Sequence, residues 1–264
     1  VVTEEVAAAW SEVYWIMADV LITFEKALYA SDNVADGDVF REVRVVDKQE
    51  LTDTVTTYTL EGDLTEARPG QYTSIGVVLA DGARQLRQYS IIGQAPGSYT
   101  IAVETEGEVS THLRDNVQVG DTIQATLAAG DLVLLDDDSP LVLISSGIGS
   151  TPMVGMLNYL AANGSQRRVL SVHADRSEAV DVLGPERTAA VDALANGTEK
   201  RWYEPEFMDL SDKGGVELAD DAQYYICGGN GFLQHVRDQL AERGVDRSRI
   251  HFELFSPNDW LLDA

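Results

Sequence analysis

The chain is poor in cysteine, in basic residues and in long apolar runs. Its 264 residues include one cysteine, Cys227, so no disulfide can form within the chain, as is usual in a reducing cytosol. Lysine and arginine number 19 against 44 aspartates and glutamates, a formal net charge of -25 that repels phosphate backbones and anionic lipid. No apolar run on the order of 18 residues is free of charge, and no secretory leader is recognisable. We therefore expect a cytoplasmic protein without a membrane span or a nucleic-acid partner.

Histidine is also scarce. The four histidines, His112, His173, His235 and His251, are scattered, and no pair has the spacing of a zinc site. With no second cysteine to help, we expect no metal bound by protein ligands.

Periodicity divides what remains into three segments, predicted as 1–33, 34–137 and 138–264. The first has helical spacing, with Trp10, Tyr14, Met17, Leu21 and Leu28 in one stripe. Glu25 falls on the same stripe, where a carboxylate would need a partner. Polar residues from 32 to 37 then indicate a linker.

The second and third segments have different patterns. Short alternating runs between Phe40 and Leu135, separated by Gly, Pro and Asp, indicate a small antiparallel β-barrel of six strands with one short helix. From Pro140, apolar strands alternate with helices, which is typical of a doubly wound α/β domain with a parallel sheet.

The strongest local motif follows the buried strand that begins the third segment. It reads Gly147, Ile148, Gly149, Ser150, Thr151 and Pro152. Two glycines let backbone N–H groups approach a phosphate, and the helix that follows turns its positive end toward it. The alternative is a tight strand-to-helix turn without a ligand. No Gly-Lys-Ser/Thr follows, so this is not a Walker motif.

A second candidate site lies in the barrel. Arg87 offers a planar fork for a pyrophosphate, Tyr89 a ring and a hydroxyl, and Ser90 a hydrogen bond to a flat heteroaromatic edge. The alternative is an ordinary strand with Arg87 outward and Tyr89 inward. Gly107 to Ser110 open a short helix that either holds a second phosphate or is simply capped by Ser110.

A third candidate ends a strand at the carboxyl edge of the sheet, where open α/β folds bind ligands. Cys227 and Gly228 stand there, although a lone cysteine is most often a small buried hydrophobe.

Taken together, an Arg-x-Tyr-Ser strand, a GxGxTP turn and a Cys-Gly strand end resemble, in this order, the ferredoxin-reductase-like family of FAD and NAD(P)H enzymes over residues 40–264. The first thirty residues, with Ala9-Trp10, Tyr14, Leu21-Ile22 and Glu25, resemble the last globin helix of the flavohemoglobins. Gly107–Leu113 and Ile250–Pro257 are also similar to that narrower family. The resemblance covers essentially the whole chain.

The resemblance implies hydride transfer from NAD(P)H to FAD, then single electrons to the haem of a globin, which converts nitric oxide and oxygen to nitrate. FAD would be bound by Tyr72, Arg87, Gln88, Tyr89, Ser90, Gly107, Val109 and Ser110. The nicotinamide dinucleotide would be bound by Gly147, Ile148, Gly149, Ser150, Thr151, Pro152, Cys227 and Gly228. The flavin would be flanked by Leu254, Phe255, Ser256 and Pro257.

Five of these implied roles are catalytic. Ser90 would lie beside the reactive ring nitrogen and Cys227 beside the nicotinamide carbon that gives up hydride. Phe255 would cover the flavin and swing aside, Glu253 would tune flavin and haem potentials, and Glu25 would orient the proximal histidine of the haem.

The chain departs from the family at several positions. Gly229 replaces the usual proline after Gly228, Ser256 replaces a glycine, and Phe24 stands where arginine is common. No histidine precedes His112, so haem b could be bound only with the missing globin half. We expect the first helix to pack on something outside this chain, such as a second copy, or to be poorly ordered.

Three questions stay open at this stage. The chain could instead be a free-standing reductase for a separate iron–sulfur or haem protein, or a nucleotide-binding subunit without turnover. Without haem, the acceptors would be dyes, ferric compounds or oxygen. Arg168 and Arg176 could reach the 2′-phosphate of NADPH, but Asp175 would oppose it.

Overall fold

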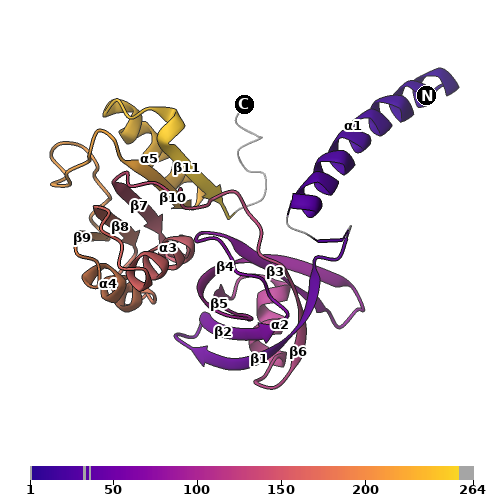
Figure 1. Cartoon of the computed structure of the whole chain (residues 1–264), viewed down its shortest axis with the longest axis horizontal. Helices are drawn as coiled ribbons and strands as arrows, with labels where there is room; N and C mark the ends of the chain where they lie inside the picture. Colours follow the sequence, from indigo (N-terminus) through magenta and orange to yellow (C-terminus); the bar gives the residue numbers. More distant parts are fainter. Residues whose placement is uncertain (1, 32–33, 36, 256–264) are drawn as a thin grey trace. The chain divides into compact units, whose positions relative to one another are not determined.

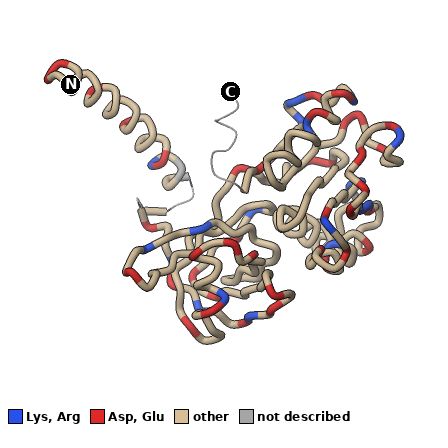
Figure 2. Tube along the Cα trace, turned by 180° about the vertical axis from the view of Figure 1, so that it is seen from behind, with Lys and Arg blue, Asp and Glu red and all other residues tan. Residues whose placement is uncertain are grey.

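The computed structural model describes residues 2–31, 34–35 and 37–255. Two compact units, Val1–Phe40 and Arg41–Ala264, make up the chain. Acidic residues occur along both units and basic ones are sparser (Figure 2), in keeping with the net charge of -25.

The first unit is dominated by one long helix, α1 (Glu4–Ser31), drawn in indigo in Figure 1. Glu4 and Glu5 stand in its first turn, where negative charge favours the helix dipole. The Tyr29 hydroxyl donates to Glu25 Oε1 at 2.5 Å, so the carboxylate on the apolar stripe has a partner within the helix.

The apolar side chains of α1 are exposed, with Trp10 at 68% and Leu21 at 66%; the side chain of Leu28 lies outside the described structure. Residues Glu4–Ala27 are long and apolar enough to cross a membrane, with a mean hydropathy of 1.3. The stretch includes the acids Glu12 and Asp19, so it is not a charge-free run, and the expectation of no membrane span stays a prediction. One helix of this kind is weak evidence, because core helices of globular proteins and signal sequences pass the same test.

In the second unit, six antiparallel strands close into a barrel in the order β1-β2-β5-β4-β3-β6 (Figure 1). The strands are β1 (Phe40–Glu50), β2 (Val55–Gly62), β3 (Tyr72–Val78), β4 (Arg84–Ala95), β5 (Ser98–Glu104) and β6 (Thr122–Thr126). Alternation explains the burial, because Val43 and Val45 are fully buried while Arg44 between them is exposed. Helix α2 (Glu108–Asn116) adds Val109 and Leu113 to the same core.

A parallel sheet of five strands follows, in the order β11-β10-β7-β8-β9. Its strands are β7 (Leu141–Ser146), β8 (Val169–Asp175), β9 (Gly197–Tyr203), β10 (Gln223–Gly228) and β11 (Ile250–Leu254). The connecting helices are η1 (Gly147–Gly149), α3 (Ser150–Ala162), α4 (Gly184–Asp192), α5 (Asn230–Glu242) and η2 (Arg247–Arg249).

Both faces of the sheet are covered, so its central strand is a continuous apolar run. On β7, Leu141 and Leu143 pack with the α3 residue Met153, whereas Val142 and Ile144 pack with Leu233 of α5. The chain builds outward from β7 through β8 to β9 and then reverses to β10 and β11. The strand order thus reverses between β7 and β10, and in such folds ligands bind at the carboxyl ends of the strands beside the reversal.

The barrel and the sheet pack against each other within the second unit. Val154 of α3 lies in a buried cluster with Ile92 of β4 and Ala102 of β5. The amide of Asn158 donates to the backbone carbonyl of Ile92 at 2.9 Å. These contacts hold the later part of β4 against the middle of α3.

The predicted fold class, a six-stranded antiparallel barrel followed by a doubly wound parallel sheet and preceded by a helix, is confirmed. Strand β9 was not expected, because only Trp202 in its sequence is buried and the remaining side chains are largely polar.

Candidate functional site

A cavity of about 910 Å³ lies where β3, β4 and β5 of the barrel meet α2, the start of α3 and the end of β11. It collects thirteen of the residues singled out from the sequence. They are Tyr72, Arg87, Gln88, Tyr89, Ser90, Gly107, Val109, Ser110, Ile148, Thr151, Glu253, Leu254 and Phe255.

The polar run of β4 presents unused hydrogen-bonding groups to this cavity. Ser90 is 3% exposed, and its hydroxyl oxygen has no hydrogen-bond partner. Arg87 donates to the carbonyl of Leu86 at 2.7 Å and to Gln85 Oε1 at 3.2 Å, both neutral acceptors. Within the described ranges it makes no ion pair. A buried hydroxyl and an uncompensated guanidinium suit a flat ligand that carries an anionic group.

Helix α2 begins at the rim of the same cavity. Gly107 is its N-cap residue in an extended conformation, and the Ser110 hydroxyl accepts from the backbone N–H groups of Glu106 and Gly107 at 3.0 Å each. The side chain of Ser110 thus closes the first turn from the third position of the helix, whereas the capping alternative had Ser110 itself as the N-cap residue.

Glu253 brings a carboxyl group to the cavity from β11. Burial, with a smaller contribution from Asp131, raises the pKa of Glu253 to about 7. Its Oε2 has no hydrogen-bond partner. This group can therefore change its protonation state near neutral pH at the wall of the cavity.

Cys227 is paired in register with Glu253 on the neighbouring strand but lies in the apolar core of the sheet, fully buried. Burial, with a contribution from Glu253, raises the pKa of its thiol well above the usual range. Its side chain lines neither this cavity nor the hollow described below, and the same holds for Gly228.

The glycine turn follows the carboxyl end of β7, beside the end of β10. Gly147 has a φ of +51°, a conformation that favours glycine, and a Cβ on Gly149 would lie 2.6 Å from the carbonyl oxygen of Cys227. Thr151 closes the start of α3 by donating to the Ile148 carbonyl at 2.9 Å. The N-terminus of α3 therefore lies at the reversal of strand order, the position of phosphate sites in such folds.

A second hollow of about 300 Å³ adjoins the turn. Gly147, Ile148 and Ser150 line it together with Asp175, Arg176 and Asp181. Gly149 and Pro152 line neither hollow. Gly149 instead packs against the backbone of Cys227.

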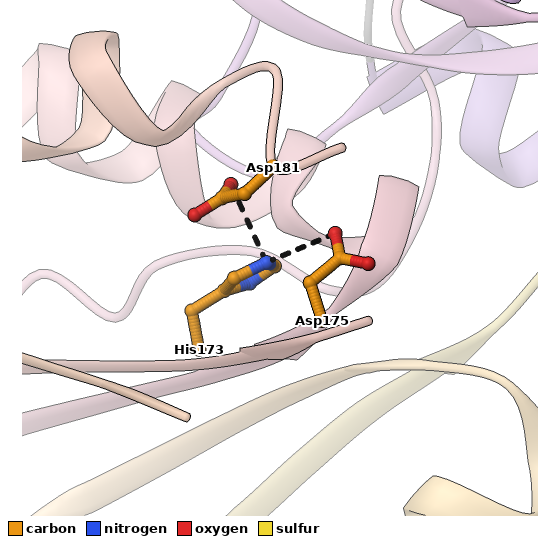
Figure 3. A group of neighbouring side chains, drawn as sticks. All are labelled: His173, Asp175 and Asp181. Carbon is orange, nitrogen blue, oxygen red and sulfur yellow. Dashed lines mark ion pairs between the residues drawn. The ribbon is translucent and has the colours of Figure 1, made fainter. Parts of the chain in front are cut away.

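Under this hollow lies a buried cluster that sequence reasoning missed (Figure 3). His173 Nε2 is 3.4 Å from Asp181 Oδ1 and 3.6 Å from Asp175 Oδ2, and it has no hydrogen-bond partner. His173 Nδ1 lies 2.9 Å from the Ser145 hydroxyl. No recognisable spacing connects these residues, because the loop between β8 and α4 brings Asp181 back to the strand.

The cluster offers three groups of metal-ligand type, but Asp181 already has a cationic partner. Arg187, itself fully buried, donates to both carboxylate oxygens at 3.1 and 2.6 Å. Burial alone would raise the pKa of Asp181, yet the hydrogen bonds from Arg187 hold it below the usual range. The absence of a protein-bound metal stays a prediction.

The remaining candidates lie elsewhere. Glu25 belongs to α1 in the other unit, and Ser256 and Pro257 lie outside the described residues. Sequence reasoning also missed Ser74, Ala102, Glu104 and Glu106 in the cavity wall. Their strands were expected, but spacing alone does not show which barrel side chains border a particular helix.

No family model matches the chain. A flavohemoprotein of Vibrio cholerae serotype O1 is 35% identical over 282 residues, which cover 98% of this chain and 71% of that protein. The chain thus spans about seven tenths of the length of such relatives.

Two solved structures are similar over most of the chain. A flavohemoglobin from Malassezia yamatoensis, determined with bound FAD and heme, superposes with a TM-score of 0.84 at 30% identity and covers 97% of this chain and 70% of its own. The FAD/NAD-binding domain of the nitric oxide dioxygenase from Vibrio cholerae O1 superposes with a TM-score of 0.76 at 32% identity, covering 82% of this chain and 99% of its own.

Proposed function

Because the chain belongs to the flavohemoprotein family, we propose that it is an NAD(P)H:FAD oxidoreductase that holds FAD in the large cavity of the second unit. The single observation that carries this proposal is the unused polar wall of β4, with a buried Ser90 hydroxyl and an Arg87 guanidinium that has neutral partners.

The described residues divide the work of holding FAD. Arg87 would bind the pyrophosphate, Tyr72 and Tyr89 would flank the flat rings, and the first turn of α2 would take a phosphate oxygen. Ser90 would donate to the flavin edge, which would satisfy its orphaned oxygen.

FAD supplies the chemistry when it is bound, because it accepts a hydride from a reduced nicotinamide and gives the electrons up singly. The Gly147–Pro152 turn would hold the pyrophosphate of the nicotinamide dinucleotide at the N-terminus of α3. Phe255, 41% exposed at the end of the described chain, would cover the flavin. Glu253 would hold or release a proton beside it near pH 7.

The electron acceptor would be the haem of a globin domain, and nitric oxide dioxygenation would be the activity of the combined protein. Support comes from α1, because similarity to flavohemoproteins covers 98% of the chain and so includes this helix. We propose units 1–33, 34–137 and 138–264, with the first completing a globin. A cytoplasmic location, and the absence of nucleic-acid and membrane partners, belong to the same proposal.

The experiment that tests the FAD site is a titration of the chain with FAD, followed by quenching of flavin fluorescence. Loss of charged hydrogen bonds in Arg87→Ala should weaken binding at least about tenfold. Arg44→Ala is the matched control, because Arg44 is an exposed barrel arginine with a distant Glu61 partner at 3.8 Å. Equal FAD affinity of the Arg87 variant and the wild type would contradict the assignment.

A further inference from the structure

The hollow beside the Gly147 turn is strongly acidic. Its charged lining consists of Asp53, Glu104, Asp175 and Asp181 against Arg176 alone. Two of the acids come from the barrel and two from the sheet domain, so the negative potential is built from both sides.

Asp175 lies where doubly wound folds bind the ribose of a dinucleotide. It is the last residue of β8, the strand next to β7, and so lies at the same carboxyl edge as the glycine turn. In doubly wound folds the adenosine ribose reaches this edge, where a carboxylate accepts the 2′-hydroxyl of NADH and an arginine accommodates the 2′-phosphate of NADPH.

One carboxylate oxygen of Asp175 is free to accept a hydrogen bond from a hydroxyl group. Its Oδ1 accepts the backbone N–H of Arg176 at 2.7 Å. Its Oδ2 lies 3.6 Å from the fully buried His173 Nε2, which is aimed between the two carboxylates of the cluster and has no hydrogen-bond partner (Figure 3). One oxygen is thus fixed by the backbone and the other keeps accepting capacity.

Among the described residues, Arg176 is the one arginine that lines the hollow. Arg187 is bound to Asp181 and to Glu199 at 2.7 Å. Arg168, a candidate from the sequence, precedes β8 at the opposite edge of the sheet and pairs with Glu217 at 3.1 Å.

We infer that this hollow binds the adenosine ribose and selects NADH over NADPH, with Asp175 accepting from the ribose and repelling a 2′-phosphate together with Asp53 and Glu104, since Asp181 is paired with Arg187. The inference rests on the proposed reductase function and names its substrate. Burial raises the pKa of Glu104, with contributions from Glu106 and Asp175, so the acids interact across the hollow.

The test compares kcat/KM for NADH and NADPH in the FAD-loaded full chain, with ferricyanide as acceptor. Because facing like charges costs several kcal/mol and each 1.4 kcal/mol is about tenfold, NADH should be preferred on the order of 100-fold. Asp175→Asn should reduce this preference at least about tenfold, mainly through a lower KM for NADPH. Glu178→Gln is the matched control, because it removes the same charge three residues away at an exposed site outside the hollow.

A second measurement needs no variant, in case Asn at position 175 prevents folding. Against NADH, 5′-AMP should compete with the wild type better than 2′,5′-ADP does. Equal use of the two nucleotides, a preference unchanged in the Asp175 variant, or tighter binding of 2′,5′-ADP would overturn the inference. Reduction by neither nucleotide, or no uptake of FAD, would instead overturn the proposed function.

Discussion

Two buried oxygens in the wall of the large cavity, Ser90 Oγ and Glu253 Oε2, have no hydrogen-bond partner. A buried polar atom without a partner costs about 1–3 kcal/mol of stability. Both atoms border the space assigned to FAD, so the folded chain retains at this site the groups that a ligand would satisfy.

The first prediction concerns Glu253. Its pKa of about 7 lies above its ordinary value of 4.5. Between these values the folded carboxyl keeps a proton that the unfolded chain releases, so the free energy of unfolding falls as pH rises through this window. In flavin-free Glu253→Gln this contribution should vanish.

Denaturant unfolding of the wild type and the variant, at about pH 5 and about pH 8, checks this prediction. The Gln variant should lose less stability than the wild type between the two values, whereas Glu178→Gln should follow the wild type. Parallel curves for wild type and Glu253→Gln would show that the carboxyl is not buried as described.

At the scale of elements, the strand-to-helix turn η1 joins β7 to α3 at the proposed dinucleotide site. Its shape depends on the close approach of Gly149 to the carbonyl of Cys227. The turn therefore requires glycine at position 149 for packing alone.

In Gly149→Ala, the added Cβ would lie 2.6 Å from that carbonyl oxygen and would force β10 and α3 apart. We expect a loss of about 1–3 kcal/mol in the free energy of unfolding, together with a higher KM for NADH. Gly231→Ala is the control, because nothing lies within 4 Å of its Cβ position and alanine favours the helix. A Gly149 variant as stable as the control would refute the close approach.

The sequence predicts most elements because their burial is periodic. Val43 and Val45 alternate with polar neighbours in β1, and the Leu141–Ile144 run is covered on both faces. Strand β9 escapes this reasoning because it is an edge strand with largely polar side chains, and its place follows from pairing with β8.

The site is predictable to a smaller extent. The motifs of β4 and of the glycine turn can be recognised in the sequence, because the residues of each motif are adjacent along the chain. The contact of His173 with Asp181 is not, because it depends on the path of the loop after β8. The acidic hollow likewise combines Asp53 with Asp175, residues of different domains.

At the scale of the whole molecule, the second unit buries its apolar side chains in cores of its own, whereas the apolar side chains of α1 are exposed. The cores of the second unit contain no residue of α1 within the described chain. Trp10 and Phe24 of α1 are 68% and 64% exposed. Exposed apolar surface of this extent marks an interaction face.

We expect a variant that starts at residue 34 to stay monomeric and to bind FAD with unchanged affinity, because its core is complete. The full chain should self-associate through α1 as its concentration rises, as light scattering would show. Trp10→Ser with Leu21→Ser in the full chain should restore the monomer. Loss of FAD binding in the shortened variant would contradict the independence of the second unit.

The central claim is that this chain holds FAD and passes hydride to it from a reduced nicotinamide nucleotide. Anaerobic mixing of the FAD-loaded protein with NADH, followed by the absorbance of oxidised flavin, tests it most directly. The account predicts rapid and complete bleaching of the yellow colour, slowed in Ser90→Ala. A protein that binds FAD yet stays yellow in excess NADH would contradict it.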